Sequence, residues 1–197
     1  MNLTHLVVSC LAATACLAQA THSVGPGGFA DIDAALAVAA PGDVVLVAPG
    51  TYPPFHATIG VTIRAVQPGS VQVTVGLTGS SVQCPGQTMR LVDLAMTFLY
   101  IADCTCALDG CSVTDAYGIN GACVATQHAT VVLNGCDLIG TNPSQIVFGS
   151  YAGLAATASR ISAVDCTFRG RPGDLFAYSG GQPGTTCGRA ARCTGRG

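Results

Sequence analysis

Three stretches of the chain align with one another without a gap: MTFLYIADCTCALDGC (residues 96–111), GACVATQHATVVLNGC (121–136) and YAGLAATASRISAVDC (151–166). Each stretch ends at a cysteine, and an apolar residue follows two positions later in every copy. A shorter copy, RLVDLAM (90–96), places Leu94 in the cysteine position. The centres of the four copies lie 17, 25 and 30 residues apart, so the spacing varies while the apolar columns persist.

The apolar residues of the repeat recur at every second position, which is the period of a β-strand and not of a helix. The aligned columns hold Leu99, Val124 and Leu154; Cys106, Val131 and Ile161; and Leu108, Leu133 and Ala163. Strands that keep their columns while the turns between them vary in length are typical of a solenoid. We therefore predict an all-β fold in which coils of short parallel strands stack along one axis.

The composition favours β-structure and argues against a nucleic-acid partner. The chain of 197 residues has no lysine and no glutamate, so its eight basic residues are arginines and its ten acidic residues are aspartates. Without Glu–Lys pairs, long exposed helices lose a common source of stabilisation. A net charge of −2 offers little to neutralise a phosphate backbone, so we expect no nucleic acid among the partners.

The first 20 residues have the pattern of a secretory signal peptide. An apolar run, LVVSCLAATACLA (6–18), leads into Ala18-Gln19-Ala20, which matches an A-x-A cleavage site. The run is too short to span a membrane, so we expect no transmembrane segment. These features predict a protein that is secreted or exported to the cell envelope after removal of residues 1–20.

Nine cysteines remain after such a cleavage, and an exported compartment permits disulfide bonds. Because nine is odd, at least one thiol stays free or pairs outside the chain. Cys111, Cys136 and Cys166 share one column, where parallel side chains seldom reach the dihedral angle of a disulfide, so we expect them to fill the core. The disulfide candidates lie outside that column: Cys84, Cys104, Cys123, Cys187 and Cys193. A paired C-x-x-C frame is missing, so no metal site is expected.

A short helix is predicted at residues 31–40, ahead of the repeats. Asp31 is a suitable N-cap and Pro41-Gly42 a suitable stop. One face of this helix is apolar and consists of Ile32, Ala35, Leu36 and Ala39. The strands that follow are too far apart for two-residue hairpins and too close for βαβ crossovers, which favours parallel coiling. The helix would cover the first coil, whose end otherwise exposes a sheet edge and the core.

The segment FADIDAALAVAAPGDVVLVAPGTYPPF (29–55), followed by VTIRAV (61–66), resembles the opening of right-handed parallel β-helix proteins of the pectin lyase-like superfamily. The later strings NGCDLIGT (134–141) and VDCTFRG (164–170) resemble the coil strands of that family. The resemblance spans residues 25–170 and implies a right-handed parallel β-helix of about five coils behind a capping helix. It implies no particular activity, because enzymes and non-enzymatic surface proteins share this opening.

We place the β-helix domain at residues 21–176. Residues 177–197 are rich in glycine and arginine and carry no apolar column, which predicts a flexible tail. A C-terminal cap is not visible in this tail, so a truncated end stays open as an alternative.

The resemblance directs the search for catalytic chemistry to aspartates and arginines, because the related enzymes act on acidic polysaccharides. The motifs of the superfamily's hydrolases, lyases and esterases are missing from this sequence. The nearest string, RGRPGD (169–174), misplaces both arginines for a lyase and lacks the aromatic residue of an esterase. A catalytic site would have to be drawn from Asp137, Asp165, Arg160 and Arg169.

Ligand-binding candidates are the other polar residues of the coils: Asp103, Asp109, Asp115, Tyr100, Tyr117 and Tyr151. Together with Asp137 and Asp165, the aspartates would share one face if the register aligns them. Stacked carboxylates of that kind would bind calcium or raise the pKa of one carboxyl group. The other interpretation is that aspartate marks the turns between coils. The tyrosines would stack against sugar rings.

We therefore predict an exported, non-catalytic β-helix module that binds glycans or a protein partner through its lateral face, without a cofactor other than the calcium alternative. The alternative function is a polysaccharide lyase-like or carbohydrate esterase-like enzyme that acts on acidic polysaccharide. Such an enzyme would combine an aspartate cluster with Arg160 or Arg169.

Overall fold

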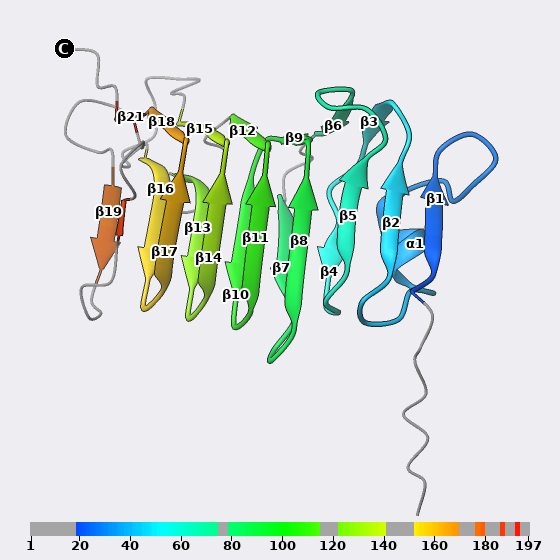
Figure 1. The fold of residues 1–197 in the computed structure, drawn as a ribbon, viewed down its shortest axis with the longest axis horizontal. Coiled ribbons are helices and arrows are strands. Elements are labelled where there is room, and N and C mark those ends of the chain that lie inside the picture. The colour runs from blue at the N-terminus through cyan, green and yellow to red at the C-terminus, as the bar shows by residue number, and fades with distance from the viewer. Residues whose placement is uncertain are drawn as a thin grey trace, which may run out of the picture.

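The computed structural model of the chain describes residues 19–74, 79–114, 122–140, 152–169, 176–179, 186–187 and 192–193. These residues form one short helix and three parallel β-sheets, which enclose a common core (Figure 1). Along the chain the strands pass from one sheet to the next in a fixed order. Each turn of the chain therefore contributes one strand to each sheet.

We name the three sheets A, B and C. Sheet A consists of β1 (Thr21–Val24), β2 (Val44–Val47), β5 (Thr62–Ala65), β8 (Thr88–Val92), β11 (Thr105–Asp109), β14 (Thr130–Asn134), β17 (Arg160–Val164) and β20 (Thr186–Cys187). Sheet B consists of β3 (Gly50–Tyr52), β6 (Val71–Val73), β9 (Leu94–Met96), β12 (Ser112–Thr114), β15 (Asp137–Ile139), β18 (Thr167–Arg169) and β21 (Arg192–Cys193). Sheet C consists of β4 (His56–Ala57), β7 (Ser80–Gln83), β10 (Leu99–Ala102), β13 (Ala122–Gln127), β16 (Ala152–Thr157) and β19 (Phe176–Ser179).

The coils wind in a right-handed sense. In Figure 1 the sheet A strands rise in front, the chain crosses at the top through the short sheet B strands, and the sheet C strands descend behind while the coils advance from β1 towards β19. The predicted fold class, a right-handed parallel β-helix with an N-terminal capping helix, is confirmed.

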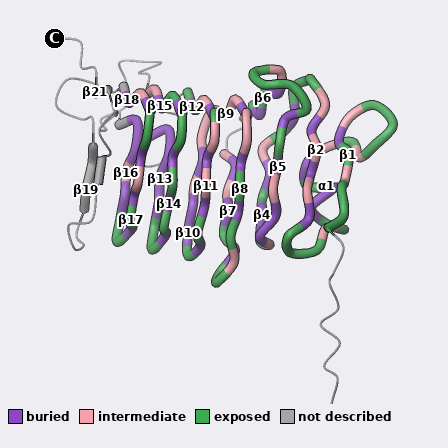
Figure 2. The backbone as a smooth tube through the Cα atoms, viewed as in Figure 1, coloured by how far each residue is buried: buried purple, intermediate pink, exposed green. Residues whose placement is uncertain are grey.

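The register of the sheets reproduces the columns of the sequence repeat. Val113 pairs with Leu138, and Leu138 pairs with Phe168. The cysteines two positions earlier, at 111, 136 and 166, therefore stack on one another, and each is at most 1% exposed. Strand residues that point inward are buried, and many of the residues at the turns between sheets are exposed (Figure 2). The core is thus a set of apolar ladders that run along the axis, and the three cysteines form one of them.

The number of coils and the length of the helix differ from the sequence prediction. The described strands make six complete coils, from β2–β3–β4 to β17–β18–β19, where about five were expected. The helix α1 spans Ile32–Leu36 and not residues 31–40. Asp31 caps it as predicted, by accepting the Ala34 N–H at 2.8 Å. The helix ends early because the chain then turns to bring the Ala40 N–H onto the carboxylate of Asp43, at 2.8 Å.

Strands continue beyond the boundary that we placed at residue 176. The backbones of β19, β20 and β21 pair with β16, β17 and β18 of the preceding coil. Except for that of Phe176, these pairings fall within residues 177–197, for which the sequence predicts a flexible tail, and the domain boundary stays a prediction. A parallel ladder is held by backbone hydrogen bonds, which do not require the apolar columns that end before this segment.

Asp43 organises the N-terminal end of the solenoid. Its carboxylate accepts the N–H groups of Ala20 at 2.9 Å and Ala40 at 2.8 Å, and lies 2.9 Å from Nε2 of His22. The residue is only 6% exposed. The hydrogen bonds from Ala40, His22 and Ala20 lower the pKa of the Asp43 carboxyl from 3.8 to about 2. The ionised form thus ties β1 and the turn after α1 to the start of β2.

Acidification is expected to remove this contribution. Because the pKa of Asp43 is lower in the folded than in the unfolded state, its stabilisation is complete above about pH 4 and is lost as the pH falls towards 2. Thermal unfolding of the wild type and of Asp43→Asn tests this. The wild type should melt at the higher temperature at pH 5, and the difference should shrink to near zero at pH 2. A difference that does not change with pH would contradict the assignment.

Candidate functional site

The structure separates the candidate aspartates. Asp103 follows β10 at the corner from sheet C to sheet A, which we call the C–A corner. Asp109 ends β11, Asp165 lies between β17 and β18, and Asp137 begins β15. The last three flank the corner from sheet A to sheet B, in three different rows and on successive coils. These four aspartates therefore do not share one face, because Asp103 lies beside the start of the sheet A strands and the other three lie beside their ends.

The candidate catalytic residues are not brought together either. Arg160 is the first residue of β17, and Asp165 comes after the last residue of the same strand. Asp137 belongs to sheet B, across the corner from sheet A. The side chain of Arg169 and the residues Asp115, Tyr117 and Tyr151 lie outside the described part of the chain.

Both kinds of corner are built from residues with a positive φ angle. At the A–B corner these residues are Asp93 (57°), Gly110 (61°), Gly135 (59°) and Asp165 (51°). At the C–A corner they are Asp103 (54°), His128 (48°) and Ala158 (48°). Glycine adopts this left-handed conformation without cost, and aspartate tolerates it better than most residues. The positions of Asp103 and Asp165 are thus explained by the geometry of the turn.

Exchanging alanine and glycine at two corners is expected to shift stability in opposite directions. Ala158→Gly should stabilise the protein by about 1 kcal/mol, because glycine relieves the strain of a positive φ. Gly135→Ala should destabilise it by about 1 kcal/mol through that strain alone, since an added Cβ would meet no atom within 4 Å. Urea denaturation measures both changes. Destabilisation by Ala158→Gly would contradict the corner geometry.

Four exposed polar residues and the half-buried Tyr100 gather beside the C–A corner on three successive coils. We call them the C–A corner cluster; its members are Gln83, Tyr100, Asp103, Gln127 and His128. The Asp103 carboxylate accepts a hydrogen bond from Nε2 of Gln83 at 3.4 Å, and its other oxygen lies 3.7 Å from Nδ1 of His128. Tyr100 donates its hydroxyl to Oε1 of Gln127 at 2.6 Å. The cluster therefore links the coils of β7, β10 and β13 on their outer side.

The cluster offers an aromatic ring, two amides, a carboxylate and an imidazole to solvent. The side chains of Asp103 and His128 are 45% and 58% exposed, so they retain hydrogen-bonding capacity towards a ligand. Ala102 lies between Gln83 and Gln127 in the register and is only 2% exposed. Because the Ala102 side chain is small, the side chains of Gln83 and Gln127 on either side of it form the surface here.

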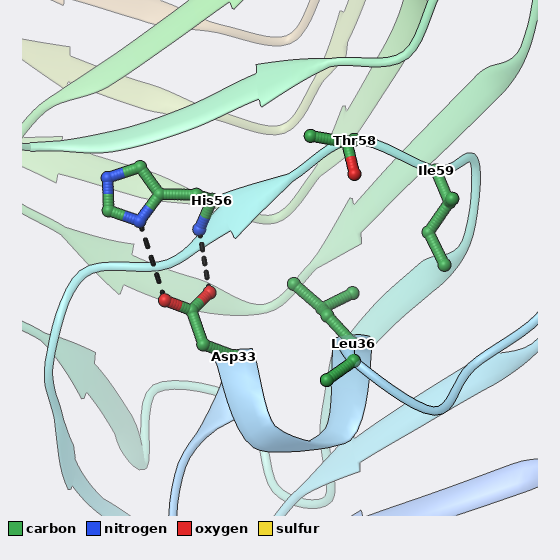
Figure 3. A pocket seen from close by; sticks show the side chains of 6 residues that line it. Asp33, Leu36, His56, Thr58 and Ile59 are labelled. Carbon is green, nitrogen blue, oxygen red and sulfur yellow. Dashed lines mark hydrogen bonds and ion pairs between the residues drawn. The ribbon is translucent and has the colours of Figure 1, made fainter.

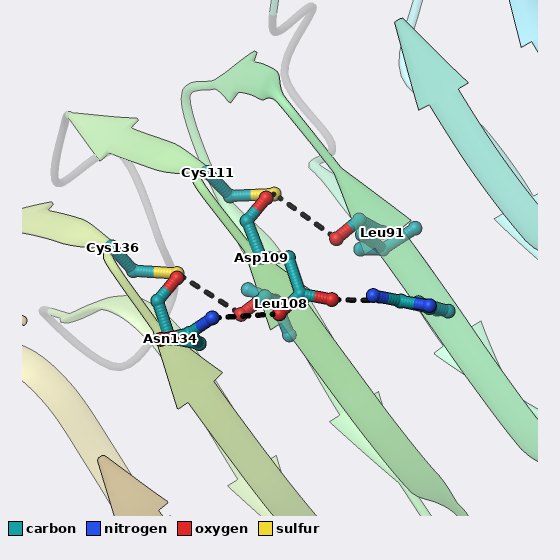
Figure 4. Close-up of polar contacts among 7 residues, drawn as sticks. Leu91, Leu108, Asp109, Cys111, Asn134 and Cys136 are labelled. Atoms are coloured by element: carbon teal, nitrogen blue, oxygen red, sulfur yellow. Dashed lines mark hydrogen bonds and ion pairs between the residues drawn. The ribbon is translucent and has the colours of Figure 1, made fainter. Parts of the chain in front are cut away.

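A second polar chain crosses the outer face of sheet A (Figure 4). Nε of Arg90 donates to one oxygen of Asp109 at 2.7 Å, and Nδ2 of Asn134 donates to the other oxygen at 3.3 Å. Both carboxylate oxygens of Asp109 are thus engaged within the protein. An exposed ion pair of this kind contributes about 0–1 kcal/mol, and its main effect is to connect neighbouring strands.

A small pocket of about 220 Å³ lies between α1 and the segment after β4 (Figure 3). Asp33 on α1 accepts the backbone N–H of His56 at 2.7 Å, and its second oxygen lies 3.4 Å from Nδ1 of the same residue. β4 is the edge strand of sheet C, so this carboxylate satisfies a backbone donor that would otherwise be free for pairing with another chain. The Asp33–His56 pair is therefore explained as protection of an edge.

Seven cysteines are buried free thiols: Cys84, Cys104, Cys106, Cys111, Cys123, Cys136 and Cys166. Cys111 donates to the carbonyl oxygen of Leu91 at 3.4 Å, and Cys136 donates to that of Leu108 at 3.2 Å (Figure 4). Burial raises the pKa of Cys111 to about 12, so it is not a reactive nucleophile. Within the part of the chain that the structure describes, no group of three or more His, Cys or Asp side chains is arranged to hold a metal ion.

Sequence reasoning missed Gln83 and Gln127, which are half of the hydrogen-bonding framework of the cluster. A glutamine alone is not part of any recognisable sequence motif. The loops differ in length, so the sequence does not make it apparent that Gln83 and Gln127 lie in one row of sheet C. A signal was nevertheless present, because the alignment of 96–111 with 121–136 places Tyr100 opposite Ala125 and diagonal to Gln127. Diagonal neighbours on adjacent strands are within reach of a tyrosine side chain.

The chain matches no family model, no curated protein and no solved structure. In the described residues, none of the helical structure has the length and apolar character needed to cross a lipid bilayer. The class of protein is therefore defined by its own structure. It is a parallel β-helix that carries a cluster of polar side chains on its lateral surface.

Proposed function

We propose that this protein is an exported, non-catalytic β-helix module that binds glycans through the C–A corner cluster. The observation that carries the proposal is the chain of exposed polar groups along three coils, with Tyr100 bonded to Gln127 and Asp103 placed between Gln83 and His128. Amides and carboxylates accept and donate the hydrogen bonds that sugar hydroxyls require, and the face of a tyrosine ring packs against sugar carbons.

Two features favour a glycan over a protein partner. The cluster extends over three coils that are spaced about 4.8 Å apart, which suits a linear ligand. None of the large hydrophobic side chains that are exposed in the described residues (Val38, Val66, Val132 and Val164) belongs to the cluster, whereas protein interfaces use such anchors for much of their binding energy. Binding is favoured over catalysis because Arg160, one of the two arginines that the enzymatic alternative could use, lies at the opposite end of β17 from Asp165.

Removing the aromatic ring is expected to weaken binding about tenfold, the equivalent of about 1.4 kcal/mol. Tyr100→Ala loses both the ring face and the hydrogen bond to Gln127, whereas Tyr100→Phe keeps the ring and should lose less. Isothermal titration against a panel of soluble polysaccharides, neutral and acidic, measures this. Thr130→Ala on the outer face of sheet A is the matched control and should bind like the wild type.

The outcomes separate the competing functions. Equal affinity of Tyr100→Ala and the wild type for a bound glycan would contradict the proposed site. Release of reducing ends or unsaturated sugars during incubation would support the enzymatic alternative instead. If no polysaccharide binds and a protein partner is captured in a way that depends on Tyr100, the ligand of this site is a protein and not a glycan.

A further inference from the structure

Two buried cysteines lie at the same corner of the solenoid, one coil apart. Cys84 comes directly after β7, and Cys104 comes directly before β11. The strands that lead into the two corners, β7 and β10, are paired, with Gln83 opposite Ala102. Cys84 is fully buried and Cys104 is 6% exposed. Continuing this register places Cys84 opposite Asp103, one residue before Cys104. With strands about 4.8 Å apart and a rise of about 3.3 Å per residue, this offset gives a Cα–Cα separation of roughly 6 Å, which lies within the range of a disulfide.

The side chains of Cys84 and Cys104 lie close enough to interact. Burial is the main reason that the pKa of each thiol is raised, and each thiol also affects the pKa of the other. Cys111 donates to a carbonyl oxygen of the preceding coil, and Cys123 donates to the carbonyl of Gly153 at 2.7 Å. Cys136 and Cys166 also interact with each other, but they belong to the column of stacked cysteines, where parallel side chains seldom reach the dihedral angle of a disulfide.

The turn at Cys84 differs from the regular corners, at which the buried side chains stack in columns. The chain turns through Pro85 and Gly86, where φ is 71°, and the Gln87 N–H donates to the Cys84 carbonyl at 3.0 Å. The corner at Cys104 uses a single left-handed residue, Asp103. Because the two corners differ in shape, the side chains do not stack in parallel as the residues of a regular column do.

We propose that Cys84 and Cys104 form a disulfide bond that joins two successive coils when the protein folds in an oxidising compartment. Each thiol loses one proton and one electron, a sulfur–sulfur bond forms, and a small-molecule or protein disulfide is reduced to two thiols. Burial raises the pKa of the Cys84 thiol to about 12, so the exchange takes place before this corner is closed. The proposal is independent of glycan binding.

The test is a disulfide map of the full chain after refolding from denaturant in a glutathione redox buffer. Because the chain has no lysine, trypsin cuts only after arginine and releases residues 65–90 with Cys84 as their one cysteine. This peptide should be found linked to residues 91–160, and cleavage before aspartate should narrow its partner to residues 103–108, which contain Cys104 and Cys106. The link should persist in Cys106→Ala and disappear in Cys104→Ala.

The melting temperature provides a second test of the disulfide. Reducing agent should lower the melting temperature of the oxidised wild type by roughly 6–12 °C and leave that of Cys84→Ala unchanged. Cys123→Ala is the matched buried control and should keep the response to reductant. Alkylation of Cys84 in the denatured, unreduced protein, or its linkage to any cysteine other than Cys104, would overturn the proposal. If the chain does not refold in vitro, the same map of protein exported to a bacterial periplasm decides the question.

Discussion

Leu133→Asp is expected to prevent folding of the β-helix or to reduce its stability by more than about 4 kcal/mol. Leu133 lies in the middle of sheet A, is fully buried, and stacks between Leu108 and Ala163. An aspartate there would be an unpaired carboxylate inside an apolar ladder, and every described neighbour along its column is apolar. Far-UV circular dichroism and urea denaturation measure the loss.

Val132→Asp is the matched control for this prediction. Val132 is the preceding residue of the same strand and is 42% exposed, because side chains alternate between the two faces of a strand. The same substitution at this position should cost less than about 1 kcal/mol. Equal destabilisation by the two variants would contradict the register from which the whole fold is built, since a slip by one residue exchanges the two faces.

The register of the strands could be predicted from the sequence because each copy of the repeat contains the residues that determine it. The column of Val113, Leu138 and Phe168 keeps a fixed offset from the preceding cysteine in each copy, and loops of any length between the copies do not disturb it. Burial on one face forces apolar residues at every second position, so the period survives even when the identities change. The coil count was harder to predict, because the first three of the six coils lack the cysteine that marks the last three.

The corners could not be predicted from apolar columns. Their requirement is a backbone angle, and the chain meets it with aspartate, histidine, alanine or glycine at equivalent positions. Asp165 therefore resembles a site residue in the sequence, although its column partner at the preceding coil, Gly135, has no side chain at all. A carboxylate that is replaced by glycine one coil away is explained by turn geometry more simply than by chemistry.

Contacts between non-equivalent positions were the least predictable part. The disulfide proposed for Cys84 and Cys104 joins two positions that no alignment of repeats pairs, because the corner at Cys84 contains the additional Pro85-Gly86 turn. Asp43 has the same character, because its donors come from Ala20 before β1 and Ala40 after α1. In this solenoid the stacking of equivalent residues along the axis can thus be predicted from the sequence. The contacts specific to this protein occur where the repeat is interrupted.

Phe168→Ala is expected to destabilise the protein by about 3–5 kcal/mol. Phe168 is 1% exposed and occupies the widest position of the column that runs from Met96 through Val113 and Leu138. From Val113 through Leu138 to Phe168 the side chains of this column grow in size, and the Phe168 ring fills the interior of its coil. Truncation to alanine leaves a cavity that the flanking backbone ladders of β15 and β21 prevent from collapsing.

Urea denaturation with an unchanged slope, and a lower midpoint, would identify this loss as one of stability alone. Phe168→Leu should recover most of the lost stability, because a branched aliphatic side chain refills the cavity at the cost of about 1–2 kcal/mol. Thr167→Ala, at the neighbouring half-buried position that faces outward, should change stability by less than about 1 kcal/mol. A cost below about 1 kcal/mol for Phe168→Ala would mean that water already reaches this ring, and that the coil of β17 and β18 does not enclose a core.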